Sequence, residues 1–326
     1  MRFTSLVSVL AFSLTVAACG DDGGKTPIDA PKAEDIGFNK PTGSLKAAFE
    51  TSKNNWTELG PANLTCLGTP SADVATTVAV ALTTRVDDFQ SGNSVPGTSV
   101  TVFRDQDAGT PFNAPVISDS TTANVTVTIP TGVKRFGFKM TNSNSLDTLL
   151  LNQTVDPAMA TQMLDHIQSV STATAQTLPA LIGVSRTPGT GILAGAVRDC
   201  GQAGRMSGTS VASGPQELTN FIATVSSTDG TVGTVTDVAH LPGVDTYYFS
   251  SSVGLPVRHS QQDASSKDGL FMAIEMQPTP TAYVQIWGYK TDADMAADKL
   301  TLIAQLKTAV IADVVITGSY EPLRTP

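Results

Sequence analysis

Histidine, cysteine and tryptophan are scarce in this 326-residue chain, which holds 3 His, 3 Cys and 2 Trp. Because His and Cys are the usual zinc ligands and catalytic bases or nucleophiles, little material is left for such sites. Charged residues make up 15% of the chain, against roughly 25% in typical soluble domains. Lys and Arg number 20 against 29 Asp and Glu, for a net charge of −9. An acidic chain without a basic cluster cannot neutralise a phosphate backbone, so we expect no nucleic-acid partner.

The residues that could hold a metal are scattered. His166, His240 and His259 are isolated, and no two have the i, i+4 or H-x-H spacing of zinc ligands. The segment Asp105–Gly109 begins like a calcium loop but lacks the oxygen ligand at its fifth position and the acid at its twelfth. We therefore expect no metal site and no cofactor.

One segment resembles a catalytic motif. Gly208-Thr209-Ser210-Val211-Ala212 is similar to the nucleophile segment of subtilisin-type serine proteases. Those enzymes need a His base and an Asp beside the serine, and no His-Gly-Thr-His or Asp-Ser/Thr-Gly element is present. The sequence predicts no catalytic residue and no enzyme activity.

The first eighteen residues are typical of an export signal. Leu6–Val16 is almost wholly apolar or hydroxylated, and it is shorter than the roughly 20 residues of a membrane-spanning helix. It leads into Val16-Ala17-Ala18-Cys19, which resembles the lipobox of bacterial lipoproteins. The resemblance implies that Cys19 is acylated and becomes the first residue of the mature chain. The alternative is an ordinary signal peptide with a coincidental cysteine.

The residues after Cys19 bear on location. In the lipoprotein family an Asp directly after the cysteine favours the inner membrane, and here that position is Gly20. The resemblance thus implies a lipid anchor in the outer membrane, on its periplasmic or cell-surface face. Residues 19–45 are polar, contain several Pro and Gly, and predict a flexible tether.

The rest of the chain contains an internal repeat. Val86, Asp88 and Gly97-Thr98-Ser99-Val100 recur 111 residues later, from Val197 to Val211, without a gap. Self-similarity at a fixed offset is typical of a structural unit that occurs more than once in a chain. We therefore expect two copies of one structural unit.

Alternating apolar and polar residues predict short β-strands in both copies. Val78–Val86 and Ser99–Phe103 are separated by a turn-prone stretch, which predicts a β-hairpin, and Gly191–Val197 precedes the second copy's turn in the same way. Further strands are expected at Val125–Pro130, Arg135–Phe138, Asp268–Ile274 and Tyr283–Tyr289.

This pattern resembles the carboxypeptidase regulatory-like, or prealbumin-like, domain. The second copy carries the resemblance through Gly195, Val197, Asp199, Gly208, Val211, Asp268, Gly269, Phe271, Gly288 and Tyr289. The first copy departs from it, with Thr121–Asn124 where Asp-Gly is expected. The resemblance implies an all-β chain of two tandem Greek-key β-sandwiches without catalytic residues of their own.

Two segments favour helices. Asp156-Pro157 followed by apolar residues at Met159, Met163, Ile167 and Val170 predicts a helical connector, with a second short helix that starts after Ser171 and runs to Ile182. The spacing of Met295, Leu302, Leu306 and Val310 favours a C-terminal helix, and the β-branched run Val310–Thr317 predicts a strand.

The expected organisation follows from these patterns. It comprises the signal peptide 1–18, tether 19–45, first sandwich 46–150, helical connector 151–185 and second sandwich 186–326, with an insertion within 213–259. Such an insertion can build a binding surface or can supply a hairpin that covers an edge strand.

The sequence predicts a class of function. We expect a non-catalytic surface or periplasmic interaction or adhesion module, with a protein or glycan partner. The alternative is a carbohydrate-binding accessory lipoprotein, which requires exposed aromatic faces. Tyr247, Tyr248 and Trp287 are the candidate ligand contacts. Tyr247 and Tyr248 would point to opposite faces of a strand, which leaves one exposed, whereas Trp287 shares one side of a strand with Tyr289, where core packing is the default.

The remaining cysteines allow one covalent prediction. With Cys19 acylated, Cys66 and Cys200 form an even pair in an oxidising compartment. We predict a disulfide that joins the start of the first sandwich to the first turn of the second. The alternative is two buried free thiols on separate domains.

Overall fold

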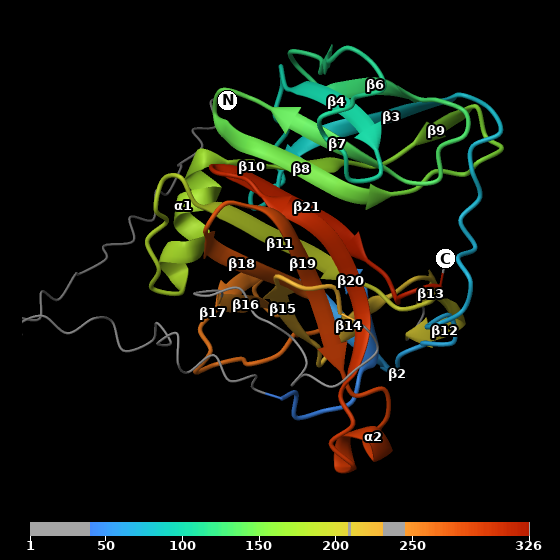
Figure 1. The fold of residues 1–326 in the computed structure, drawn as a ribbon, viewed down its shortest axis with the longest axis vertical. Helices are drawn as coiled ribbons and strands as arrows, with labels where there is room; N and C mark the ends of the chain where they lie inside the picture. The colour runs from blue at the N-terminus through green and yellow to red at the C-terminus, as the bar shows by residue number, and fades with distance from the viewer. Residues whose placement is uncertain (1–39, 208–209, 231–244, 326) are drawn as a thin grey trace, which may run out of the picture.

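A computed structural model describes residues 40–207, 210–230 and 245–325. The described chain is mostly β-structure and forms two β-sandwiches, one above the other in Figure 1. The expected all-β class is confirmed. No helix among the described residues is long and apolar enough to cross a membrane.

The first sandwich has two layers whose inward side chains form one core. One layer contains β6 (Asn124–Ile129), β3 (Val80–Asp88), β9 (Thr161–Met163) and β10 (Ile167–Ser171). The other layer contains β5 (Val116–Ile117), β4 (Ser99–Arg104), β7 (Phe136–Thr141) and β8 (Ser145–Gln153). Strict alternation of buried and exposed residues along β6 shows why this sequence forms a half-buried strand.

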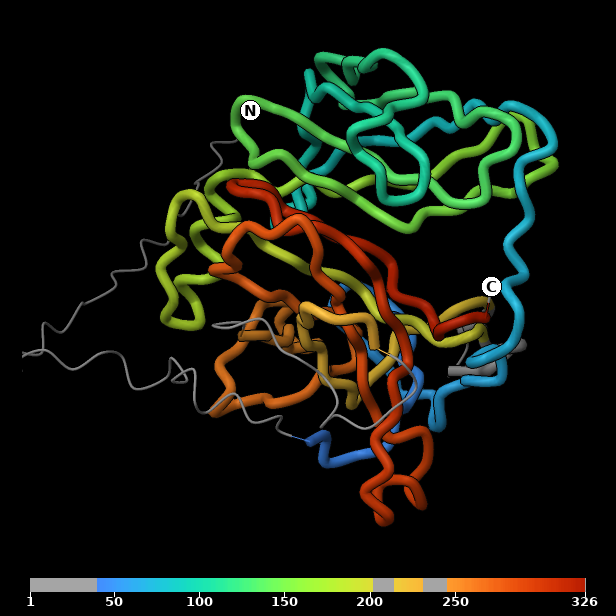
Figure 2. The backbone as a smooth tube through the Cα atoms, viewed as in Figure 1, coloured from blue at the N-terminus to red at the C-terminus, as the bar shows by residue number. Residues whose placement is uncertain are grey.

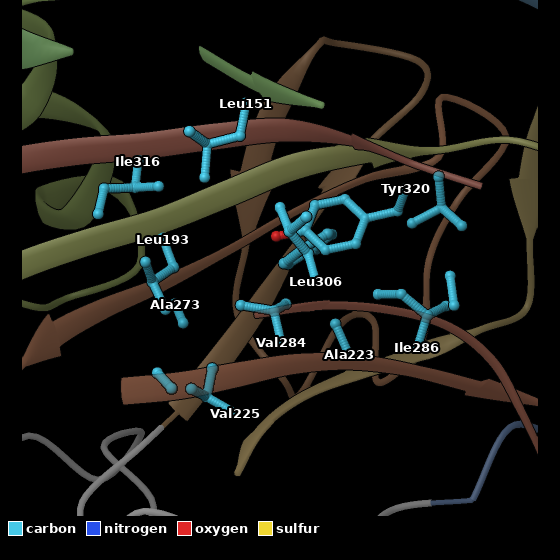
Figure 3. Close-up of a cluster of buried hydrophobic side chains, with 14 of the residues drawn as sticks. Leu151, Leu193, Ala223, Val225, Ala273, Val284, Ile286, Leu306, Ile316 and Tyr320 are labelled. Atoms are coloured by element: carbon cyan, nitrogen blue, oxygen red, sulfur yellow. The ribbon is translucent and has the colours of Figure 1, made fainter. Parts of the chain in front are cut away.

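The second sandwich repeats this plan. One layer contains β17 (Leu255–Val257), β16 (Asp245–Ser250), β18 (Leu270–Met276), β11 (Gly191–Val197) and β21 (Val314–Tyr320). The other layer contains β15 (Ile222–Ser226), β19 (Thr279–Gly288) and β20 (Thr301–Val310). Side chains such as Leu193, Val284, Leu306 and Ile316 meet between the layers (Figure 3).

The repeat seen in the sequence is a repeat of topology. β3 and β11 each lie between an antiparallel strand, β6 or β18, and a parallel strand, β10 or β21. In the opposite layers, β4 pairs with β7 and β7 with β8, as β15 pairs with β19 and β19 with β20. The two copies therefore share one order of strand pairing.

The predicted hairpin between the first two strands of each copy is wrong, although the strands exist. β4 pairs with β5 and β7, not with β3. In the second copy β13 (Ser210–Gly214) pairs with β12 (Gln202–Ser207), so the strand equivalent to β4 is β15. The reason is that the chain after β3 crosses to the other layer, which period-2 patterning cannot distinguish from a hairpin.

A continuous sheet joins the sandwiches. β8 pairs antiparallel with β7 of the first sandwich and parallel with β21 of the second. Leu150 packs against the first core, whereas Leu149 and Leu151 belong to the second core. The strands of the first sandwich and one layer of the second therefore form one thirteen-stranded sheet.

The N-terminal hairpin packs with the second sandwich, whereas the expected domain division at residue 46 assigns it to the first. It consists of β1 (Lys46–Ser52) and β2 (Asn55–Pro61), and β1 pairs with β14 (Glu217–Thr219) of the second sandwich. Leu45 is fully buried there against Gly288. The chain then runs along the side of the molecule to β3 (Figure 2), so the first sandwich is inserted within the sequence of the second.

Both expected longer helices are wrong. Residues 156–170 form β9 and β10 instead, with Met163 85% exposed and Ile167 buried in the first core. The parallel neighbour β3 supplies the hydrogen bonds that make this segment a strand. Residues 301–310 form β20 because its paired neighbour β19 and the second core lie beside it, and only α2 (Asp292–Ala296) is helical there.

Other local predictions agree with the structure. α1 (Thr172–Leu181) is the short helix expected after Ser171, whose side chain accepts a hydrogen bond from the Thr174 amide. The β-branched C-terminal run forms β21, starting at Val314 rather than Val310. In the insertion, β16 pairs with β18 and β17 with β16, so part of it extends the sheet edge; residues 231–244 lie outside the described chain.

Candidate binding site: an apolar crevice between the sandwiches

A crevice lies where the shared sheet passes from the first sandwich to α1. Its volume is about 200 Å³. Phe89 and Val170 line it from the first sandwich, and Leu178 lines it from α1. Strands β11, β18 and β21 supply its floor. The crevice thus continues the interior of the first sandwich along the sheet.

The floor has small side chains at its centre. Across the paired strands, Leu150, Thr317, Ala194 and Met272 are in register, so they lie on one face of the sheet. On the opposite face, a Cβ placed on Gly195 would lie 2.2 Å from a ring carbon of Tyr320. The small residues of β11 therefore leave space on the crevice face, while the other face is closely packed.

One charged side chain, Arg198, lines the crevice within the described chain. Its Nε donates to Oε1 of Glu217 at 3.2 Å, and its side chain is 46% exposed. Burial raises the pKa of Glu217, and the charge of Arg198 opposes that shift. The end of the crevice at Arg198 is therefore polar, with a cation facing an apolar floor.

The wall formed by α1 is fixed to the first sandwich. Asp88, at the end of β3, accepts a hydrogen bond from the Ser171 amide at 3.0 Å and contacts the Thr174 hydroxyl at 3.2 Å. Burial opposes ionisation of Asp88, but hydrogen bonds from Ser91 and Ser171 outweigh it and lower its pKa. The rings of Phe89 and Phe249 meet edge to face at 5.8 Å between centroids. These contacts hold the crevice walls together.

A second set of contacts fixes the sandwiches away from the crevice. Arg135 donates to Asp73 at 2.6 Å, to Glu321 at 2.9 Å and to Asn152 at 3.1 Å. The hydrogen bond from Arg135 holds the pKa of Asp73 below its usual value. This cluster ties the first sandwich to the segment before β3 and to the C-terminal segment.

The predicted disulfide is present between Cys66 and Cys200, with Cα atoms 5.7 Å apart. Cys66 follows the N-terminal hairpin and Cys200 follows β11, so the closed loop of 134 residues contains the whole first sandwich. The disulfide therefore joins the chain segments that come before and after the inserted sandwich.

The aromatic residues predicted as ligand contacts are buried. Tyr247 and Tyr248 are each 3% exposed, and Trp287 is 1% exposed. The two tyrosines do point to opposite faces of β16, but α1 and neighbouring strands cover one face and the second core covers the other. The prediction of an exposed ring at Tyr247 or Tyr248 is wrong because both faces of this sheet are covered.

The histidines differ in their surroundings. His259 Nε2 lies 2.7 Å from Oδ1 of Asp245, and its ring lies 4.7 Å from that of Tyr247. Burial lowers the pKa of His259, but the Asp245 carboxylate outweighs it, so the pKa is raised overall. His166 lies on the surface beside Asp165. No group of three or more His, Cys, Asp or Glu that could hold a metal occurs among the described residues.

Sequence reasoning missed the crevice residues. In the sequence, Arg198 is an unmatched position of the repeat, between Val197 and Asp199, where the first copy has Asp87. That mismatch was the one available signal, since the crevice depends on how β8, β11 and β21 are brought together. Cys19, predicted to be lipidated, lies outside the described residues.

Comparisons with known proteins identify no family for this chain. No family model and no curated protein matches the chain. The shaft pilin SpaA from Lactobacillus rhamnosus GG is similar over 77% of this chain and 98% of its own, at 12% identity and a TM-score of 0.21. A streptococcal ancillary pilin is similar over 76% of this chain and 63% of its own, at 11% identity and a TM-score of 0.20. At these scores, neither fold nor function is inferred from them.

Proposed function

We propose that this chain is a non-catalytic interaction module, held at the outer membrane by an acylated Cys19, and that it binds its partner in the crevice. The observation that carries the proposal is the crevice itself. It is an apolar space of about 200 Å³ with one cationic end, between bodies joined by a shared sheet, a disulfide and an arginine cluster. Concave, mostly apolar sites with few placed polar groups are the usual form of binding sites.

The absence of a catalytic arrangement supports a binding role. Asp245 is the one hydrogen-bond partner of the His259 imidazole within the described chain, and Tyr247 covers that ring. A nucleophile hydrogen-bonded to the imidazole, which a triad requires, is not among the described contacts. His259 therefore has the surroundings of a packed ion pair.

The anchor is supported by sequence. The lipobox-like Val16–Cys19 segment precedes a polar stretch that ends where the described fold begins. A single acyl chain gives marginal membrane binding, and two or more give stable anchoring. Lipidation at Cys19 would therefore place the sandwiches at the membrane surface on a tether.

The carbohydrate-binding alternative has less support. Stacking on a sugar ring needs an exposed aromatic face, and Tyr247, Tyr248 and Trp287 are all buried. The interaction module remains the function that the site favours.

Site-specific photocrosslinking tests the binding role. A crosslinking residue at Gln168, which lines the crevice, is compared with one at Gln176, which is exposed on α1. We expect the Gln168 probe, and not the Gln176 probe, to form an adduct of defined mass in the native cells. Equal labelling at both positions, or none at Gln168, would overturn the proposal.

Cys19→Ser tests the anchor separately. We expect it to abolish acyl labelling and to release the protein from membranes. A substituted protein that still fractionates with membranes would show that the lipobox interpretation is wrong.

A further inference from the structure

We propose that the crevice binds a linear amphiphile with an anionic head group, whose apolar chain lies along β11 and whose head pairs with Arg198. The inference rests on the proposed function, because it names the ligand class of the same site. Three features carry it: the apolar lining, the elongated floor and the position of the single cation.

The lining suits an apolar chain. Apart from Arg198, the described residues that line the crevice are uncharged, and aliphatic or aromatic side chains predominate among them. An engineered apolar cavity of roughly 150 Å³ stays dry and binds benzene. A crevice of about 200 Å³ is large enough to hold an apolar group of that size or larger.

The floor is elongated along one strand. Ile192, Ala194 and Ala196 lie at alternate positions of β11, Arg198 follows directly after its last residue, Val197, and all four line the crevice. The six residue steps of extended chain from Ile192 to Arg198 span roughly 20 Å, from the end covered by α1 to the guanidinium end. A flexible chain fits such a floor better than a compact ring system does.

The cation defines the head group. A guanidinium has five N–H donors. Among the described residues, Arg198 donates one of them, from Nε, to Glu217. Its terminal amino groups have no acceptor within the described chain, and no acidic side chain lines the crevice there. A carboxylate or phosphate head can accept from these groups in a bidentate arrangement.

The strand edges argue against an extended peptide. β11 pairs with β18 on one edge and with β21 on the other, and β21 also pairs with β8. The floor therefore offers no free backbone groups for strand addition. A ligand must be held by apolar contacts and by Arg198.

Calorimetric titration of the Cys19→Ser chain with octanoate, decanoate, dodecanoate and tetradecanoate tests the proposal. Because burying a methylene contributes about 0.8 kcal/mol, affinity should rise roughly fourfold per added CH₂ until the crevice is filled. Dodecanol and dodecyltrimethylammonium are the head-group controls, and each should bind at least about tenfold more weakly than dodecanoate.

Variants locate the site. Ala196→Leu fills the floor and should weaken dodecanoate binding about tenfold or more, whereas Ala180→Leu, on the exposed side of α1, should leave it unchanged. Arg198→Gln should remove the preference for dodecanoate over dodecanol, and Glu217→Gln should strengthen dodecanoate binding. Arg104→Gln, an arginine outside the crevice, is the matched control. Circular dichroism of each variant shows that the fold is retained.

The outcomes separate the two proposals. Affinity that does not depend on chain length, or that Ala196→Leu leaves unchanged in a folded protein, overturns the amphiphile inference. If the Gln168 probe still gives its specific adduct, the crevice remains the interaction site for another ligand. If neither the adduct nor amphiphile binding is found, both proposals fail.

Discussion

Leu150 and Leu151 are neighbours in β8, yet their side chains contribute to the cores of different sandwiches. Successive side chains of a strand point to opposite faces, so one strand lying between two bodies serves both. β8 is hydrogen-bonded to β7 on one edge and to β21 on the other. The two sandwiches therefore cannot rotate freely about a linker, and the crevice between them has fixed walls.

Truncation in β8 tests this shared role. Leu151 is 1% exposed in the second core, so Leu151→Ala should lower the free energy of unfolding by roughly 2–5 kcal/mol. Because the strand belongs to both bodies, urea unfolding followed by far-UV circular dichroism and by tryptophan fluorescence should show one coincident transition. Two separate transitions would mean that the sandwiches unfold independently.

The disulfide should stabilise the fold because it lowers the conformational entropy of the unfolded chain. Cys66→Ala combined with Cys200→Ala opens a loop of 134 residues and should cost up to about 4–5 kcal/mol on the chain-entropy model. Urea unfolding of the double variant against the Cys19→Ser parent gives the difference. Thiol titration of the denatured, unreduced parent should find no free thiol, and two free thiols would contradict the bond.

The Arg135 cluster should contribute to stability in a pH-dependent way. Arg135→Met leaves Asp73 and Glu321 without their cation and should cost roughly 1.5–3 kcal/mol, whereas Lys53→Met on the surface should change stability by no more than about 0.5 kcal/mol. The pKa of Asp73 is lower in the folded chain than in the unfolded one. Its contribution is therefore present above pH ~4 and is lost as the pH falls through the folded value. An Arg135→Met cost that stays constant down to pH 2 would contradict this assignment.

A buried carboxyl near Glu217 should give the opposite pH dependence. Burial raises the pKa of Asp268 to about 7, and its Oδ2 has no hydrogen-bond partner in the described structure. The folded pKa lies above the unfolded one, so the contribution is complete below pH ~4 and is lost as the pH rises through about 7.

Asp268→Asn tests this dependence. The substitution should raise stability at pH 8 by up to about 4 kcal/mol and leave it nearly unchanged at pH 4. Urea unfolding at the two pH values measures the difference. A gain of equal size at both would show that Asp268 does not titrate in this range.

Local sequence patterns predicted the features that depend on neighbouring residues in the chain. The alternation in β6, the N-cap Ser171 of α1 and the repeat that begins with β3 and β11 could all be identified from the sequence. Pairing partners could not, because a strand's pattern shows which face is buried and not what lies at its edges.

The two wrong helices have the same cause. The apolar spacing in 156–170 and 295–310 matches a helical face, but in each case a neighbouring strand with unpaired hydrogen-bonding groups decided the structure. The crevice could not be predicted for a related reason. Arg198 and Leu150 lie far apart in sequence and line the same crevice only because β21, the last strand, lies between β8 and β11.

The most direct test of the account is a crystal structure of the Cys19→Ser chain grown with dodecanoate. We predict electron density for the alkyl chain over Ala194 and Ala196, with the carboxylate within hydrogen-bond distance of the Arg198 terminal amino groups. An empty crevice in crystals that hold dodecanoate elsewhere on the protein would contradict the account.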